Sequence, residues 1–154
     1  SVCFPNFLVL KIMSCSGVKV PPEVVTKFTQ MKKEKSSRYI LIEFTKNNTE
    51  VGIAKEAPIS ATYDDFLQDL NARAAENKGY YAVYDYTLNN NNKLIFVCWA
   101  PENCNAREKM LLSSTKKDVI KKFDGVAGDI NATDADEISE ETMIEKVKSC
   151  MKNI

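Results

Sequence analysis

The 154-residue sequence contains no histidine, which is the commonest general base near neutral pH and the commonest metal ligand. Its five glycines are scattered and form no phosphate-binding loop. Because the sequence has no histidine, Cys98 has no imidazole to activate it as a nucleophile. The acidic pairs Asp64-Asp65 and Asp134/Asp136 suit helix starts and turns better than catalysis or cation binding. We expect neither an enzyme nor a bound cofactor.

The five cysteines show no spacing that is typical of disulfide pairs or of a metal site. None of the five belongs to a CxxC motif, and their odd number fits no complete disulfide framework. Free thiols in a reducing compartment are the simplest interpretation, and a metal site is not expected. The five are Cys3, Cys15, Cys98, Cys104 and Cys150.

No excess of either charge and no long apolar run is present. Lysine plus arginine equals aspartate plus glutamate, 21 against 21, which disfavours duplex nucleic acid as a partner. No apolar stretch reaches the roughly 20 residues that span a bilayer. With 44% hydrophobic and 27% charged residues, the composition is that of a single globular domain, expected to be a monomer.

The first twelve residues, SVCFPNFLVLKI, are apolar, but they lack the basic start and small-residue cleavage site of a signal peptide. Met13 follows and resembles an initiator. We interpret residues 1–12 as a leader or cloning-derived extension and 13–154 as one domain. An extra strand or a docking segment is the alternative. If present, the extension should crowd the segment that follows it.

Periodicity predicts four helices and five strands. Helices are expected from Pro22 to near the run 32–35, at 64–75, at about 106–123 and from Ser139 onward. Strands are expected at 39–44, 51–54, 80–86 and 94–99, with 126–132 as an edge strand. Ile144, Val147, Met151 and Ile154 form the expected apolar stripe of the last helix. Strand 94–99 is almost continuously apolar, which is typical of a central strand covered on both faces. The fold class is therefore α+β: a mixed five-stranded sheet sandwiched by helices.

The long helix concentrates the positive charge. Taken alone, such a run is usually a solvated helix face. Ser113-Ser114-Thr115 in its middle favours a bend, because their hydroxyls can bond to carbonyls one turn back. The basic residues are Arg107, Lys109, Lys116, Lys117, Lys121 and Lys122.

The stretch WAPENCNAREKMLLSSTKKDVIKKFDGV, residues 99–126, closely resembles the signature of the ADF/cofilin family. Residues 13–18, with a serine before Gly-Val, are similar to the amino terminus of the family. Residues 80–86 resemble its Tyr-Ala-x-Tyr-Asp strand, and residues 132–139 resemble the entry to its last helix. The match covers residues 13 to about 151.

The resemblance implies the ADF-homology fold and an actin-binding protein that prefers ADP-actin and promotes filament severing and depolymerisation. It implies contacts to the actin monomer through Ser16, Gly17, Val18, Arg107, Lys109, Met110, Lys116 and Lys117. It implies filament contacts through Lys93, Glu145, Lys146 and Lys148, and phosphoinositide binding through Lys116, Lys117, Lys121 and Lys122. Ser16 matches the regulatory phosphorylation site. A cytoplasmic, cytoskeletal location follows, with the nucleus as a second location shared with actin.

Two departures from the family pattern refine these expectations. The turn at 88–93 is short and carries only Lys93, so monomer binding should be stronger than side-binding to filaments. Without histidine, actin binding should change little between mildly acidic and mildly alkaline pH.

Other functions remain open. Within the same fold, a coactosin-like filament binder or a regulator of the branch-nucleating Arp complex is an alternative, although Ser16-Gly17 and the Arg107 to Met110 step argue against both. From another class, a phosphoinositide-binding adaptor without depolymerising activity would bind lipid but not actin.

Overall fold

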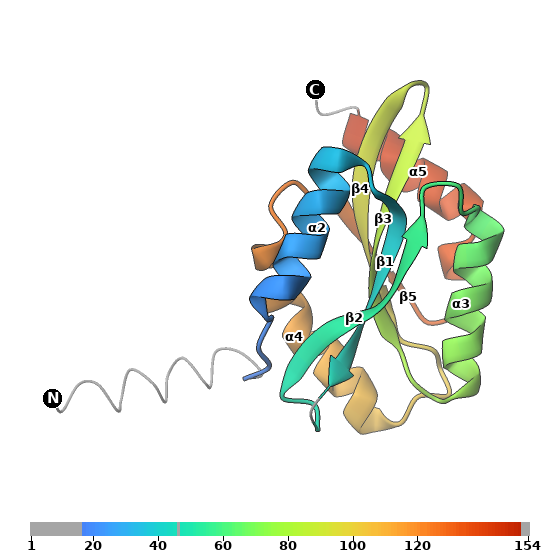
Figure 1. Cartoon of the computed structure of the whole chain (residues 1–154). Coiled ribbons are helices and arrows are strands. Elements are labelled where there is room, and N and C mark those ends of the chain that lie inside the picture. Colours follow the sequence, from blue (N-terminus) through green and yellow to red (C-terminus); the bar gives the residue numbers. More distant parts are fainter. Residues whose placement is uncertain (1–16, 46, 152–154) are drawn as a thin grey trace, which may run out of the picture.

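A computed structural model describes residues 17–45 and 47–151 (Figure 1). The helices are α2 (Pro22–Glu34), α3 (Tyr63–Ala75), α4 (Ala106–Lys122) and α5 (Glu140–Met151), with a short 3₁₀ helix η1 (Asp136–Ile138) before the last. The strands are β1 (Ser37–Thr45), β2 (Glu50–Pro58), β3 (Tyr80–Leu88), β4 (Asn91–Trp99) and β5 (Gly128–Ala132). The predicted order of elements is confirmed.

The five strands form one mixed sheet in the order β2-β1-β3-β4-β5. The first three neighbouring pairs are antiparallel, and β5 joins the edge parallel to β4. A parallel neighbour cannot follow through a tight turn, so the chain crosses over through α4. The predicted fold class and the edge position of the last strand are confirmed.

An asparagine pair lets β4 run further than the pattern predicted. Asn89 and Asn90 both have positive φ, the conformation that a two-residue hairpin turn of type I′ requires, and Leu88 pairs with Asn91 across them. Polar residues therefore continue the ladder up to the turn, and β4 begins at Asn91 instead of Leu94. At the other hairpin, β2 extends to Pro58 instead of Ala54 because its pairing with β1 continues to Ser37.

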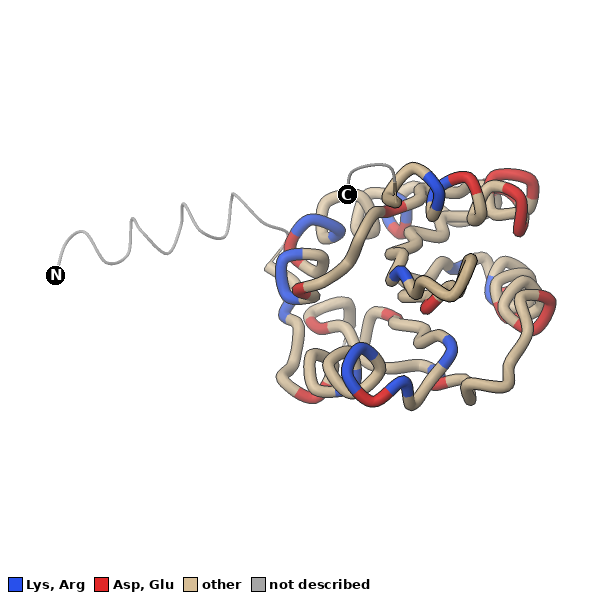
Figure 2. The backbone as a smooth tube through the Cα atoms, turned by 90° about the horizontal axis from the view of Figure 1, so that it is seen from above, with Lys and Arg blue, Asp and Glu red and all other residues tan. Residues whose placement is uncertain are grey.

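Helices cover both faces of the sheet, as the view from above shows (Figure 2). The helices α3 and α5 cover one face, over a core that includes Tyr39, Phe66 and Trp99. The helices α2 and α4 cover the other, where Phe28, Phe96 and Phe123 are buried. Charges of both signs occur side by side around the molecule.

The start of the last helix is as predicted, and its apolar stripe is confirmed in part, because Val147 is buried and Met151 packs against the core. The Ser139 hydroxyl accepts a hydrogen bond from the Thr142 backbone N–H, which caps α5. Met143 and Val147 are fully buried, whereas Ile144 is half-buried. Met143, which the stripe did not include, belongs to the same core cluster as Ile138 of η1. Ile154 lies outside the described residues.

The buried tyrosines predict loss of stability in alkali. Burial raises the pKa of Tyr39, Tyr63 and Tyr81, and raises that of the Cys98 thiol to about 11. An unfolded chain would lose these protons first, near pH 8.5 to 10, so the folded state binds more protons above that pH. The free energy of unfolding in urea should be flat from pH 7 to 8 and fall at pH 9.5 and 10.5. An unchanged value at pH 10.5 would contradict this.

Candidate functional site

The solvent-exposed face of α4 carries a stripe of residues at helical spacing. Arg107, Met110, Ser114, Lys117 and Lys121 recur every three or four positions, and all are exposed. Met110 is 66% exposed; among the described residues, the only other large hydrophobic side chain classed as exposed is that of Ile59. An exposed thioether flanked by cations is suited to a partner with an apolar pocket and acidic rim.

The amino-terminal half of α4 is held firmly. The Asn105 side chain caps the helix by accepting a hydrogen bond from the Glu108 N–H at 2.8 Å. The Lys109 Nζ donates to the Glu102 carbonyl at 2.8 Å, and the Glu102 N–H donates to the Thr133 carbonyl at 3.2 Å. These bonds tie the start of the helix to the loop after β4 and to the segment after β5.

A second anchor reaches the same loop from α3. The Asn103 amide donates to the Ala74 carbonyl and to Asn77 Oδ1. The indole N–H of Trp99 donates to the Leu70 carbonyl at 2.9 Å. The loop that positions the α4 stripe is therefore fixed on the far side of the sheet as well.

The three amino-terminal residues of the expected site, Ser16 to Val18, differ in what the structure shows of them. Ser16 lies outside the described residues. Gly17 is exposed with φ of +79°, a backbone conformation that favours glycine. Val18 is only 9% exposed and packs in the core beneath α2 and α4. Its side chain therefore anchors this segment and leaves little surface for a partner.

The ammonium group of Lys116 is held by contacts within the protein. Its ammonium group pairs with the Asp129 carboxylate and donates to Asn131 Oδ1 at 2.7 Å, and its side chain is 17% exposed. The contact fastens α4 to the edge strand β5. Lys117, Lys121 and Lys122 are exposed, so they are the more accessible part of the expected phosphoinositide set.

The fold adds lysines from α2 that sequence reasoning did not include. Phe28 of α2 stacks on Phe123 at 4.6 Å between ring centroids. The Lys32 Nζ donates to the Asp124 carbonyl at 2.8 Å, just beyond the end of α4. The carboxyl ends of the two helices therefore meet. Lys33, which is exposed, lies at the end of α2 that contacts the end of α4. The run Lys32–Lys35 was the available signal, but it also fits a helix end.

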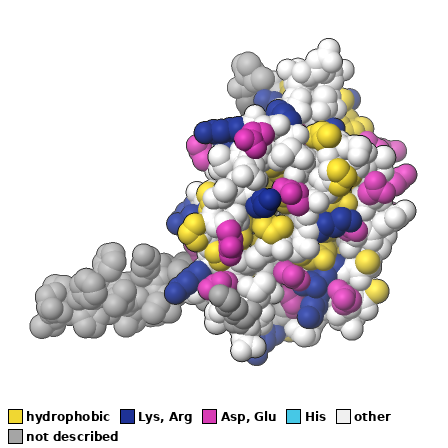
Figure 3. Space-filling model, viewed as in Figure 1, with side chains coloured by type: hydrophobic (Ala, Val, Ile, Leu, Met, Phe, Trp, Pro, Cys, Tyr) yellow, Lys and Arg dark blue, Asp and Glu magenta, His cyan; other side chains and the backbone are white. Residues whose placement is uncertain are grey.

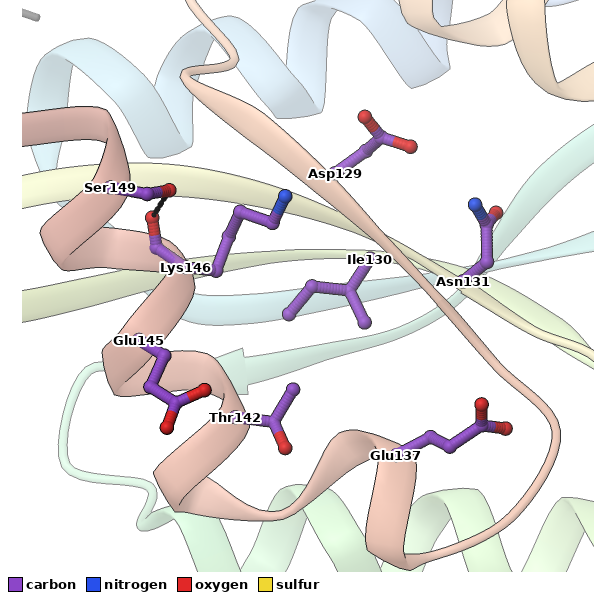
Figure 4. Close-up of a pocket in the computed structure, with 8 residues that line it drawn as sticks. All are labelled: Asp129, Ile130, Asn131, Glu137, Thr142, Glu145, Lys146 and Ser149. Atoms are coloured by element: carbon purple, nitrogen blue, oxygen red, sulfur yellow. Dashed lines mark hydrogen bonds between the residues drawn. The ribbon is translucent and has the colours of Figure 1, made fainter.

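Two of the four expected filament residues border a hollow of about 550 Å³ between β5 and α5 (Figure 4). Glu145 and Lys146 line it, and Lys146 extends from α5 toward β5. Lys148 is exposed on the same helix. Lys93 comes from β4, opposite Tyr86, whose hydroxyl donates to Glu140 at 2.7 Å.

Residues 17–45 and 47–151 contain neither a cluster of metal-binding side chains nor a membrane-spanning helix. In the described part of the chain, no three acidic or cysteine side chains are grouped to hold a metal ion. Nor does any helix there have the length and apolar character to cross a membrane. The face formed by α2 and β2 carries scattered hydrophobic side chains among charges of both signs (Figure 3).

Comparison with known proteins gives consistent results. Residues 17–148 match a family model described as cofilin/tropomyosin-type actin-binding protein. Actophorin of Entamoeba histolytica is 38% identical over 137 residues, covering 89% of this chain and 99% of that protein. Cofilin of Schizosaccharomyces pombe is 38% identical over 139 residues, covering 88% and 98%.

Solved structures of other proteins show the same fold. Streptomyces griseoflavus cofilin has a TM-score of 0.77 at 34% identity, covering 84% of this chain and 96% of that one. Coactosin from Entamoeba histolytica has a TM-score of 0.73 at 17% identity, covering 89% and 99%, which shows the shared fold alone.

Proposed function

The chain belongs to the ADF/cofilin family of actin-binding proteins, and we propose that it binds ADP-actin monomers and filaments and promotes filament severing and depolymerisation. The observation that carries this proposal is the rigid start of α4, where exposed Met110 stands beside Arg107 and Lys109. The thioether would fill an apolar pocket on actin while the cations pair with acidic groups around it.

Severing would follow from differential binding. A protein that binds a twisted filament conformation better than the ordinary one shifts subunits toward that conformation. The filament is then strained at the boundaries between stretches that carry the protein and stretches that do not. The filament contacts of Glu145, Lys146 and Lys148 on α5 would supply this second surface, with Lys93 as the single cation of the β3–β4 turn region. Monomer binding should accordingly exceed side-binding to filaments.

Regulation would act at Ser16 and at the basic residues of α4. Phosphorylation of Ser16 adds nearly two negative charges and would weaken binding to an acidic partner. Phosphoinositides would engage Lys117, Lys121 and Lys122, and compete with actin for α4. The protein would then act in the cytoplasm and at the cytoskeleton, and in the nucleus where actin is present.

A filament pelleting assay tests the proposal. Actin filaments are sedimented with increasing amounts of the protein beginning at Met13. We expect the protein to co-sediment and to move actin into the supernatant. Co-sedimentation without release of actin would favour a coactosin-like filament binder. Actin left untouched, together with binding to phosphoinositide vesicles, would favour the adaptor and refute the proposal.

A further inference from the structure

The tip of the β3–β4 hairpin extends beyond its neighbours in the sheet (Figure 1). The strand β1 pairs with β3 no further than Tyr84, and β5 pairs with β4 only from Ile95 onward. The ladder between β3 and β4 continues past these points to Leu88 and Asn91. A two-stranded ribbon is marginally stable on its own, so the contacts at its base set its direction.

Asp85 lies at the base of this ribbon and is completely buried. Its Oδ1 accepts a hydrogen bond from the Asn92 amide at 3.0 Å, and its Oδ2 lies 3.8 Å from the Nζ of Lys35, the residue directly after α2. The Asp85 carbonyl also accepts a hydrogen bond from the Arg38 guanidinium of β1 at 2.9 Å. A buried carboxylate is costly unless it is paired, so separating these groups is unfavourable.

The other face of the ribbon is held by α5. Successive side chains of a strand point to opposite faces, so Tyr86 lies on the face opposite to Asp85. The Tyr86 hydroxyl donates to Glu140, at the start of α5, at 2.7 Å. Lys93 is paired with Tyr86 across the ladder, and directly paired residues share a face. Lys93 therefore belongs to the α5 face of the ribbon, whereas its neighbour Asn92 is bonded to Asp85 on the opposite face.

We infer that Asp85 is a positioning residue for filament binding, which holds the ribbon in a fixed direction relative to α5 so that Lys93 and the α5 residues contact a filament together. This inference rests on the proposed function, which assigns both groups to filament binding. Contact groups that are already held in a fixed arrangement lose less conformational freedom on binding. Asp85 itself is buried and acts through the groups that it holds.

Asn92→Ala tests this role, because it removes the donor to Asp85 from an exposed residue and disturbs no core packing. In a co-sedimentation titration we expect the affinity for actin filaments to fall about fivefold, the effect of misplacing one partly exposed charge. In a titration of labelled ADP-actin monomers the affinity should stay within about twofold of wild type. Asn91→Ala is the matched control. The exposed Asn91 side chain donates to the Asn89 carbonyl within the turn, and its loss should leave both affinities unchanged.

Double-mutant cycles separate positioning from general destabilisation. Lys93→Ala removes the positioned charge, so in that background Asn92→Ala should have little further effect on filament affinity. The effects of Asn92→Ala and Lys148→Ala should be additive, because Lys148 lies on α5, which stays in place. Equal additivity in both cycles would overturn the inference.

A reciprocal exchange guards against loss of binding through misfolding. Asn92→Asp sets a second carboxylate against Asp85 and should lower filament affinity further than Asn92→Ala does. Adding Asp85→Asn restores a hydrogen bond from an amide to a carboxylate between the same two positions, so filament affinity should recover in part. If wild type binds filaments and Asn92→Ala binds equally well, or if Asn92→Ala lowers monomer and filament affinity alike, the positioning role is wrong and the proposed function stands. If wild type does not bind filaments, the proposed function fails, and this inference fails with it.

Discussion

Met110→Glu should weaken binding to actin monomers by about 30-fold or more and leave the fold intact. The side chain belongs to the α4 stripe and is 66% exposed, so the substitution removes no core packing. Truncating a central apolar anchor of an interface typically costs about 2 kcal/mol or more, which corresponds to about 30-fold in affinity. A carboxylate facing an acidic partner adds repulsion and desolvation to that loss.

A matched control separates this effect from a general change in charge. Ala72→Glu introduces the same charge at an exposed helical position, on α3 across the sheet. We expect its monomer affinity to stay within about twofold of wild type, as surface changes outside an interface generally do. The measurement is a titration of labelled ADP-actin monomers, with the melting temperature of each variant recorded. Equal affinities for the two variants would show that α4 is not the contact surface.

Lys109→Ala complements this experiment, although its interpretation differs. The ammonium group donates to the Glu102 carbonyl, so the substitution loosens the loop before α4 as well as removing a charge. We therefore expect Lys109→Ala to affect affinity and stability together, whereas Met110→Glu should affect affinity alone.

The sequence was sufficient to predict the fold and most of the α4 surface. Apolar patterns predicted the five strands and four helices, since most elements have an apolar face of period two or 3.6 and strand 94–99 is a continuous apolar run. The exposed stripe from Arg107 to Lys121 also follows from helical spacing, once Leu112, Thr115 and Val119 are taken as the buried side. The residue pattern within an element was therefore enough to predict which of its faces is buried, wherever the element's own apolar residues decide this.

Contacts between distant segments could not be predicted in this way. Lys116 looks like its neighbours in the sequence, and only the position of Asp129 on β5 shows that it is committed internally. The Lys32–Asp124 contact joins residues 92 positions apart. Lys19 is hydrogen-bonded through its backbone to Thr49 and Val51, and backbone atoms leave no signature in the pattern of side chains. Such features depend on how the helices and strands are assembled.

Gly79→Ala should destabilise the protein strongly, with an expected cost of about 3 kcal/mol, the upper part of the range for overpacking a core. Gly79 is buried between α3 and β3. An added Cβ would collide with the Trp99 carbonyl, and would lie 2.7 Å from Leu112 Cδ1. Because the carbonyl belongs to the adjacent strand, the backbone itself must move.

Thermal unfolding measures the effect. For a domain of this size each kcal/mol shifts the melting temperature by about 2–4 °C, so a decrease of roughly 6–12 °C is expected. Gly52→Ala is the matched control, because the nearest atom to its added Cβ is the Thr45 methyl group at 3.2 Å, which can rotate away. Alanine also restricts the unfolded chain, which offsets part of that small strain. Similar melting temperatures for the two variants would contradict the predicted collision.

The same collision should reach the proposed actin-binding surface on α4. Leu112 lies two residues beyond Met110 on α4, and Trp99 precedes the loop whose Glu102 carbonyl holds Lys109. Relief of the clash would displace both supports of the α4 stripe. Where Gly79→Ala remains folded at low temperature, its affinity for actin monomers should therefore fall, whereas that of Gly52→Ala should not. A folded Gly79→Ala variant with full affinity would show that the stripe tolerates movement of its base, and that its rigidity is not needed for binding.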